Sequence, residues 1–334
     1  MTSISNLNRG SQEGLEPQAG SGANLEIVVL LPCYNEAETI GVVVRAFRQV
    51  LPLASIHVFD NNSSDGTAQC AREAGALVHT VRHQGKGNVV RRMFADIEAD
   101  VYLLADGDGT YDANSAPLLI DALLNNGLDM VVGCRVSDLR ESYRLGHRTG
   151  NRLLTQCVGV IFGQTFTDML SGYRVFSRRF VKSYPAHAQG FEVETELTIH
   201  ALNLRMPVAE IPTPYGTRPE GSSSKLNTWA DGWKILLMIA RMFKTEKPLL
   251  FFSLAFVSCA VLSVLLAIPV LTDYLATGLV PRFPTAILSV AIMLFGTIML
   301  ACGIILDTVT RGRMETKRFA YLSHARLTVA SQDE

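Results

Sequence analysis

The apolar positions of the chain follow two patterns, one in its N-terminal part and one toward its C-terminus. From Glu26 to Gly133, short apolar runs alternate with longer stretches of helical periodicity. The short runs predict strands at 27–31, 55–59, 77–81, 101–105 and 130–133. The stretches between them predict helices at 37–50, 67–74, 89–98 and 114–125. Strands separated by helices predict a mostly parallel α/β sheet with helices on both faces.

Two longer apolar runs follow, Leu249–Leu271 and Phe283–Leu306. Each exceeds the roughly 20 residues that a helix needs to cross a hydrocarbon core of about 30 Å. The short linker Thr272–Arg282 predicts that they form a hairpin of two membrane spans. Buried helices of a soluble protein are the alternative, which two successive uncharged runs of this length disfavour.

Lys and Arg residues flank the two spans on one side. They are Lys234, Arg241, Lys244 and Lys247 before the first span, and Arg311, Arg313, Lys317, Arg318 and Arg326 after the second. The linker between the spans carries only Arg282. Because basic residues stay on the cytoplasmic side, we expect a two-span protein of the cell inner membrane with its large N-terminal domain in the cytoplasm.

These patterns divide the chain into five regions. They are a disordered tail (1–24), a cytoplasmic domain (25–225), an interfacial helix (226–247), the transmembrane hairpin (248–307) and a cytoplasmic basic tail (308–334). The interfacial helix is inferred from apolar residues at helical spacing over 226–244. A helix packed on the domain core is the alternative for the same pattern.

Composition narrows the partners and the redox chemistry. Hydrophobic residues make up 48% of the 334 residues and charged residues 18%, a balance that favours a membrane protein. The net charge of −1 gives no electrostatic case for nucleic acid as a partner. The six cysteines form no Cys-x-x-Cys pair, so a disulfide framework or a zinc site is not expected.

Polar residues directly follow all five predicted strands. They are Tyr34, Asn35 and Glu36, the run 60–67, the run 85–88, Asp106 and Asp108, and Arg135. Ligands of parallel sheets bind in the crevice beyond the carboxyl ends of the strands. Five polar loops at one edge therefore predict a site for a charged, hydroxyl-rich ligand.

Asp106-Gly107-Asp108 carries the most specific chemistry of these loops. Two carboxylates one residue apart offer hard oxygen ligands that suit Mg²⁺ or Mn²⁺ holding a diphosphate. Gly107 between them allows backbone and ligand to approach closely. A loop of solvated acids is the alternative.

Other nucleotide and metal motifs fail at defined positions. The run 85–88 lacks the first glycine and the hydroxyl of a P-loop. The run 32–36 stands where a dinucleotide-binding glycine motif would follow the first strand. An EF-hand beginning at Asp106 would need Gly and Glu where Tyr111 and Pro117 lie.

Taken in order, the motifs resemble those of family 2 glycosyltransferases of the GT-A fold. The motifs are 31–36, 60–67, 85–88 and 106–108. Two downstream motifs, 168–174 and 218–225, resemble the polyprenyl-phosphate glycosyltransferases, the group that contains dolichyl-phosphate mannose synthase and bacterial relatives with two C-terminal spans. The resemblance covers about residues 26–310 and implies a Rossmann-like GT-A domain followed by the interfacial helix and the two spans.

The chain departs from this pattern at three places. Cys33 stands where many relatives have Ala, and Asn61 where a second Asp is common. After the acidic pair, 109–112 replaces the usual Leu-Gln-His or a similar run. The last departure leaves the identity of the sugar open, whereas the diphosphate chemistry is unaffected.

The resemblance implies a nucleotide-diphospho-sugar donor, UDP- or GDP-linked. Its expected binding residues are Pro32, Tyr34, Asn35, Glu36, Asp60, Asn62, Lys86, Asp106, Gly107 and Asp108. Asp106 and Asp108 are the expected ligands of Mg²⁺ or Mn²⁺. Helix capping is the alternative for Glu36 and Asp60, and a solvated loop lysine is the alternative for Lys86.

The resemblance also implies a polyprenyl phosphate acceptor in the bilayer. Its phosphate is expected to meet Arg135, Arg148, Arg174, Arg218 and Lys225, with some of these as ordinary surface charges. The expected catalytic residues are Asp108, Asp168 and Arg174. Asp168 is either a general base or a residue that orders Arg174 or the metal shell. The loop 216–225 is either a mobile lid or a passive linker.

These expectations combine into inverting, metal-dependent sugar transfer to a polyprenyl phosphate of undecaprenyl type at the cytoplasmic leaflet. Transfer to another lipid or to a polysaccharide hydroxyl, and a non-catalytic membrane scaffold that binds nucleotide sugars, are the alternatives. Gly296 and Gly303 lie seven residues apart in the second span and hint at a homo-oligomer.

Overall fold

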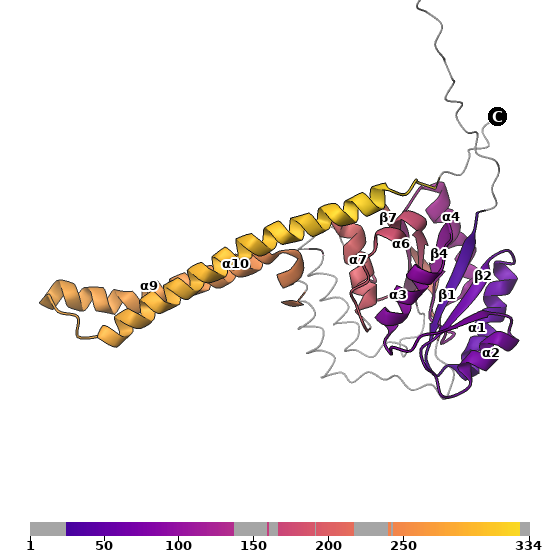
Figure 1. Cartoon of the computed structure of the whole chain (residues 1–334), viewed down its shortest axis with the longest axis horizontal. Coiled ribbons are helices and arrows are strands. Elements are labelled where there is room, and N and C mark those ends of the chain that lie inside the picture. The colour runs from indigo at the N-terminus through magenta and orange to yellow at the C-terminus, as the bar shows by residue number, and fades with distance from the viewer. Residues whose placement is uncertain are drawn as a thin grey trace, which may run out of the picture.

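The protein, described here by a computed structural model, consists of an α/β domain from which a long helical hairpin extends (Figure 1). The structure describes residues 25–136, 159, 166–190, 192–216, 240–241 and 243–327. Most of the expected interfacial helix lies outside these residues.

The domain is built on one seven-stranded sheet with the order β3-β2-β1-β4-β6-β5-β7. The strands are β1 (Ile27–Cys33), β2 (Ser55–Asp60), β3 (Leu77–Thr80), β4 (Val101–Leu104), β5 (Met130–Val136), β6 (Arg174–Ser177) and β7 (Val208–Pro214). All neighbours pair in parallel except β6, which runs antiparallel to both β4 and β5. The five expected strands and the parallel sheet are confirmed, while β6 was not foreseen.

Helices connect the strands and cover both faces of the sheet. They are α1 (Ala37–Val50), α2 (Thr67–Glu73), α3 (Lys86–Asp96), the 3₁₀ turn η1 (Ala113–Ser115), α4 (Ala116–Asn125), α6 (Arg178–Ser183) and α7 (Val193–Asn203). Helix α3 begins at Lys86 instead of Val89, so the polar run at 85–88 is already the first turn of the helix.

The side chains of β1 show how the two faces are filled. Val28 and Leu30 belong to one buried apolar cluster, which includes residues of α3, α6 and α7. Val29 and Leu31 point the other way, into a cluster with residues of α1, α2 and α4. A strand buried on both faces has no polar alternation, which explains why β1 is a continuous apolar run.

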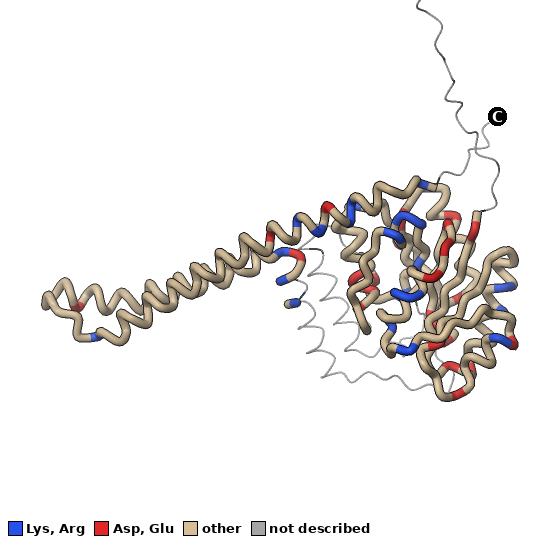
Figure 2. The backbone as a smooth tube through the Cα atoms, viewed as in Figure 1, with Lys and Arg blue, Asp and Glu red and all other residues tan. Residues whose placement is uncertain are grey.

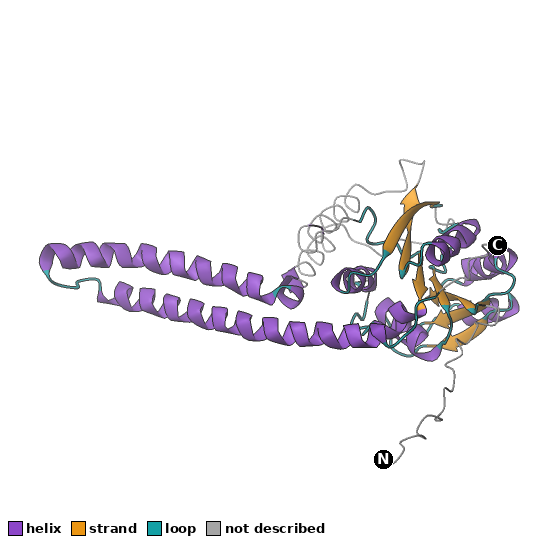
Figure 3. Cartoon of the chain, turned by 90° about the horizontal axis from the view of Figure 1, so that it is seen from above, coloured by secondary structure: helices purple, strands orange, loops and turns teal. Residues whose placement is uncertain are grey.

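The hairpin consists of α9 (Pro248–Thr277) and α10 (Phe283–Leu322). Both helices are long and apolar enough to cross a membrane, with mean hydropathies of 2.7 and 2.4 over their most apolar windows. Within the hairpin, Lys, Arg, Asp and Glu occur only at the tip and in the part near the domain (Figure 2). Figure 3 shows the two helices running side by side.

Helix α10 continues past the apolar run and is attached to the domain at its end. The Tyr321 hydroxyl donates to Asp129 Oδ2 over 2.8 Å, and the Arg179 guanidinium lies 4.7 Å above the Tyr321 ring. Asp129 is fully buried and also accepts from Ser177 Oγ and Arg179 Nε. The start of the expected basic tail is therefore helical and held by a buried carboxylate.

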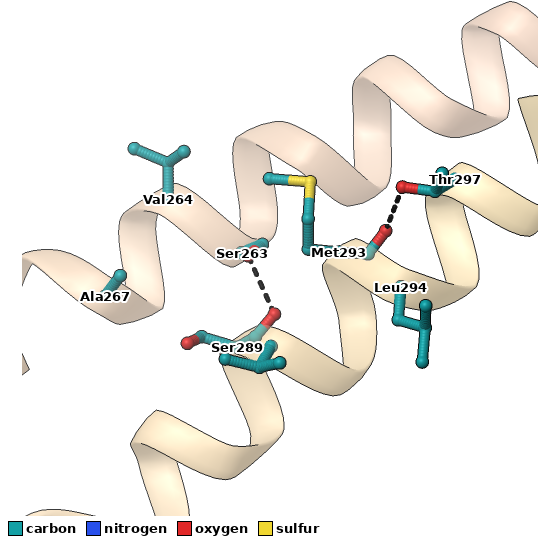
Figure 4. Close-up of a pocket in the computed structure, with 8 residues that line it drawn as sticks. Ser263, Val264, Ala267, Ser289, Met293, Leu294 and Thr297 are labelled. Atoms are coloured by element: carbon teal, nitrogen blue, oxygen red, sulfur yellow. Dashed lines mark hydrogen bonds between the residues drawn. The ribbon is translucent and has the colours of Figure 1, made fainter.

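Small residues bring the two hairpin helices close together. A Cβ atom added to Gly303 would lie 2.8 Å from Phe252 Cβ, and one added to Gly296 would lie 2.9 Å from Cys259 Cβ. Ser263 Oγ donates to the Ser289 carbonyl across the interface, at the edge of a groove of about 480 Å³ (Figure 4). The spacing of Gly296 and Gly303 is thus explained by packing within one chain.

Gly303→Ala should destabilise the hairpin, while Gly312→Ala should not. Overpacking a tight contact costs about 1–3 kcal/mol, whereas nothing lies within 4 Å of a Cβ atom at Gly312. Alanine is otherwise the better helix former by up to about 1 kcal/mol. Thermal unfolding in detergent should give a lower midpoint for Gly303→Ala and an equal or higher one for Gly312→Ala. Equal midpoints for the two variants would contradict the packing described here.

Candidate active site

The loops after β1 and β2 are tied together by backbone-to-side-chain hydrogen bonds. Asn35 N donates to Ser63 Oγ over 2.9 Å, and Ser64 N donates to Asn35 Oδ1 over 2.9 Å. Glu36 N donates to Thr67 Oγ1 over 2.8 Å. The polar run after β2 is therefore largely a scaffold that holds the loop after β1 in place.

Three residues at the end of β2 and in the loop after it have structural roles. Asp60 is buried and accepts from Ser63 N over 3.3 Å, and Asn62 has a positive φ of 64°. Asp65, which sequence reasoning did not single out, accepts from Ala37 N and from Thr67 N, each over 3.1 Å. Asp65 therefore fastens the two loops and does not point to a ligand role.

The structure explains why Asn61, one of the departures from the family pattern, is an amide. Its Nδ2 donates to the Val81 and His83 carbonyls, and its Oδ1 accepts from Gly85 N over 2.7 Å. Only an amide can donate and accept in this way, since an aspartate has no donor when ionised. Asn61 fixes the segment that leads into α3 and to Lys86.

The acidic pair follows β4, as expected, and its two members have different surroundings. Asp108 is buried and its Oδ1 accepts from Thr110 Oγ1 over 2.6 Å and from Thr110 N over 3.1 Å. Asp106 is partly exposed, with 27% of its side chain accessible. A Cβ atom at Gly107 would lie 2.4 Å from Cys33 Sγ and 2.5 Å from Glu36 Oε2. Gly107 therefore permits a close approach of the pair to the loop after β1.

Glu36 adds a third carboxylate to this edge of the sheet. Its Oε2 is buried and has no hydrogen-bond partner among the described residues. Burial, followed by the charges of Asp106 and Asp108, raises the pKa of Glu36 to about 8. Glu36 makes no side-chain hydrogen bond as the N-cap of α1, so the capping alternative is not supported.

A divalent cation fits this arrangement. The residues that the structure describes include no group of three His, Cys, Asp or Glu ligands placed to hold a metal alone. Asp106 and Asp108 instead offer two carboxylates beside the orphaned buried oxygen of Glu36. Mg²⁺ commonly uses one or two carboxylates together with the oxygens of a substrate phosphate.

Lys86 is a largely buried cation next to the acidic pair, so the alternative of a solvated loop lysine is wrong. Its Nζ lies 2.5 Å from Asp106 Oδ1 and 2.6 Å from Glu194 Oε1, with 12% of the side chain exposed. Burial by itself lowers the pKa of Lys86, but Asp106 and Glu194 raise it above its ordinary value. Glu194 lies in the first turn of α7 next to a second acid, Glu196, so nothing in the local sequence marks it as a partner of Lys86.

Arg174 requires a correction. Its side chain is completely buried, and it donates to the Ser171 and Met169 carbonyls and to Thr198 Oγ1 over 2.8, 2.6 and 2.9 Å. A guanidinium used in this way orders the loop before β6 and does not face a ligand. The expected catalytic and lipid-phosphate roles of Arg174 are therefore wrong, because burial removes it from the crevice.

Arg135, at the end of β5, forms a two-pronged ion pair with Asp168. Its Nε donates to Asp168 Oδ2 and its Nη2 to Asp168 Oδ1, both over 2.7 Å. The Arg135 guanidinium also lies 5.5 Å from the centre of the Tyr215 ring. Of the alternatives for Asp168, the structure shows the ordering of an arginine, but the arginine is Arg135 and not Arg174.

The remaining expected site residues divide by their position. Pro32 lies within β1, and Tyr34 follows it with 39% of the residue exposed. Arg148, Arg218 and Lys225 lie outside the described residues, as does most of the loop 216–225.

A mostly parallel sheet with an acidic pair after a central strand, next to a buried lysine and a hydrogen-bonded loop after the first strand, is the arrangement expected of a glycosyltransferase domain of the GT-A type. The chain belongs to this class by sequence as well: it is a member of glycosyltransferase family 2, whose model "Glycosyl transferase family 2" matches residues 28–184. The chain is therefore a glycosyltransferase with two apolar C-terminal helices.

Known proteins agree with this assignment. Glycosyltransferase AglJ of Haloferax volcanii is 37% identical over 287 residues, which cover 85% of this chain and 93% of that protein. A dolichyl-phosphate hexose transferase of the same organism is 27% identical over 222 residues, or 66% and 96% of the two chains. Glucosyl-3-phosphoglycerate synthase of Mycobacterium tuberculosis, crystallised with Mn²⁺ and UDP, shares the fold with a TM-score of 0.52 at 24% identity, over 66% of this chain and 79% of that one.

Replacing Arg174 by Lys should reduce stability, and it should do so more than Arg135→Lys. Lysine cannot reproduce the three buried hydrogen bonds of the Arg174 fork, a loss of about 2–3 kcal/mol. Arg135→Lys keeps a positive charge beside the buried Asp168 carboxylate and loses only the second prong of the pair, so it should cost about 1 kcal/mol. Denaturant unfolding of both variants tests this. If the Arg174→Lys variant were fully stable but bound substrate poorly, Arg174 would have the functional role expected from the sequence.

Proposed function

We propose that this glycosyltransferase moves a sugar from a nucleotide-diphospho-sugar, UDP- or GDP-linked, to a membrane polyprenyl phosphate of undecaprenyl type. The proposed reaction takes place at the cytoplasmic leaflet, proceeds with inversion and depends on Mg²⁺ or Mn²⁺. One observation carries the proposal: a chain with two membrane-length helices gathers Glu36, Asp106, Asp108 and Lys86 at the carboxyl edge of its sheet. The polyprenyl-phosphate transferase among its relatives supports the choice of acceptor.

On the donor side, Asp106 and Asp108 would hold the divalent cation against the two phosphates, and the cation would neutralise the charge of the departing nucleoside diphosphate. Lys86 supplies positive charge next to Asp106. The loops after β1 and β2, which are hydrogen-bonded to each other, would bind the nucleoside. Its expected contacts include Tyr34, Asn35, Asp60 and Asn62.

On the acceptor side, a lipid phosphate needs no strong general base. The second pKa of a phosphomonoester is about 6, so at neutral pH its oxygen is already a nucleophile. That oxygen would attack the anomeric carbon while the bond to the diphosphate breaks, which inverts the anomeric centre without a proton transfer. Asp168 would then orient Arg135, whose guanidinium suits a phosphate. Arg148, Arg218 and Lys225 are further proposed phosphate contacts.

The two apolar helices of the hairpin would place the proposed reaction at a membrane surface. The isoprenoid tail stays in the bilayer while its phosphate must reach the domain. The basic residues next to both spans favour the cytoplasmic side for that domain. An inner-membrane protein with its site in the cytoplasm meets both requirements.

The proposal is tested by incubating membranes that contain the protein with labelled sugar nucleotides and undecaprenyl phosphate. We expect a metal-dependent, lipid-linked product that one nucleotide sugar alone supports best. A product that resists the mild acid that hydrolyses a glycosyl phosphate would be a glycoside of a hydroxyl acceptor and would favour transfer to another lipid. Nucleotide binding without any product would favour a scaffold, and either result would overturn the proposal.

Asp108→Asn should lower transfer by at least about a hundredfold, the usual scale for removing a group that stabilises charge in the transition state. Asp106→Asn should also lower it, because both carboxylates are proposed metal ligands. Asp121→Asn, on the exposed face of α4, is the matched control and should leave activity unchanged. Product formation at several Mn²⁺ concentrations measures the effect. A wild-type rate for Asp108→Asn would contradict the proposed metal site.

A further inference from the structure

The ammonium of Lys86 is held by two carboxylates that come from distant parts of the chain. Asp106 follows β4 and Glu194 lies in the first turn of α7, and their oxygens lie 2.5 and 2.6 Å from Nζ. The Lys86 and Glu194 side chains are only 12% and 6% exposed. A triad of this kind carries one negative charge more than it needs to neutralise the lysine.

The backbone around this triad has little room to move. Gly87 N donates to the Gly190 carbonyl over 3.1 Å, and a Cβ atom at Gly85 would lie 2.2 Å from the Gln189 carbonyl oxygen. On the other side, a Cβ atom at Gly172 would lie 2.9 Å from Asp106 Oδ2 and 3.0 Å from Lys86 Nζ. The main chain of Lys86 is therefore fixed, and only the end of its side chain has freedom to change partners.

The two carboxylates differ in what a donor would do to them. Asp106 is the more exposed member and belongs to the proposed metal–diphosphate site, so a bound cation would compete with Lys86 for its oxygens. Glu194 is buried on a core helix, near an N-terminus that favours negative charge.

We propose that Glu194 is a positioning residue for sugar transfer: it retains the Lys86 ammonium in the site when the metal takes Asp106, so that the ammonium turns to the donor diphosphate. This inference rests on the proposed nucleotide-sugar donor. Without Glu194, Lys86 would have Asp106 as its one carboxylate partner in this triad and would compete with the metal for it. Glu194 thus acts on the donor through Lys86 and does not touch the reacting atoms.

The test uses the full-length protein in detergent and compares Glu194→Gln with Glu192→Gln. Glu192 is exposed just before the same helix and accepts a hydrogen bond from Gln189 N over 3.2 Å, which a glutamine side-chain oxygen can also accept, so its variant removes the same charge and keeps that contact. Binding of UDP and of GDP in the presence of Mn²⁺ is measured by calorimetry, together with kcat and the donor KM. Glu194→Gln should weaken nucleotide–metal binding and raise the donor KM by about tenfold, the scale of a lost charged hydrogen bond. kcat should change less than KM, and Glu192→Gln should behave as wild type.

Two further variants separate positioning from a purely structural role. In a Lys86→Met background, Glu194→Gln should have no additional effect on binding, because the residue through which it acts is gone. Glu194→Asp, which keeps the charge, should recover part of the loss and also serves if Glu194→Gln fails to fold.

Each outcome decides the matter. Wild-type binding by Glu194→Gln, or an equal loss with and without Lys86, overturns the role of Glu194 while the proposed function stands. A wild-type protein that binds neither nucleotide with Mn²⁺ overturns the proposed function and this inference together.

Discussion

The concentration of negative charge at one buried edge of the sheet is the constraint on which the rest of the site depends. Burying carboxylates is costly unless cations or hydrogen bonds compensate them. Lys86 and Thr110 compensate Asp106 and Asp108 in part, but one oxygen of Glu36 stays without a partner among the described residues. An edge with an excess of buried acid is suited to bind a cation, and a cation makes it suited to bind a diphosphate.

The place where the hairpin is attached to the domain is consistent with a site at this edge of the sheet. Asp129, which receives Tyr321 of α10, directly precedes β5, so it lies at the amino edge of β5. Arg135 lies at the carboxyl end of β5, and the acidic pair lies beyond the carboxyl end of β4. The helix that ties the domain to the apolar hairpin is therefore anchored at the opposite edge of the sheet from the candidate site.

Much of this arrangement could be predicted because it depends on local patterns. The apolar runs of β1, β2 and β4 and the polar residues after them are contiguous in sequence, so their place at the carboxyl edge follows from the parallel sheet. The partners of Lys86 could not be predicted in the same way. Glu194 is more than 100 residues away, and its contact depends on how α7 packs under α3. Asn61 was recognised as a departure, but its bridge to Gly85 needs the folded loops.

Arg174 and Asp168 show most clearly what the sequence could not predict, because the positions of both residues depend on the direction of β6. An all-buried strand of four residues has no period that reveals whether it runs parallel or antiparallel. Because β6 is antiparallel, it is its beginning that lies at the carboxyl edge, with Arg174 opposite Leu104. The loop from Asp168 to Tyr173 is thereby delivered to the site from the other direction, where Asp168 meets Arg135 and Gly172 lies against Asp106 and Lys86. Arg174, the first residue of the strand, then turns inward to hold that loop, and this is why a residue of the right chemistry in the right motif has a structural role.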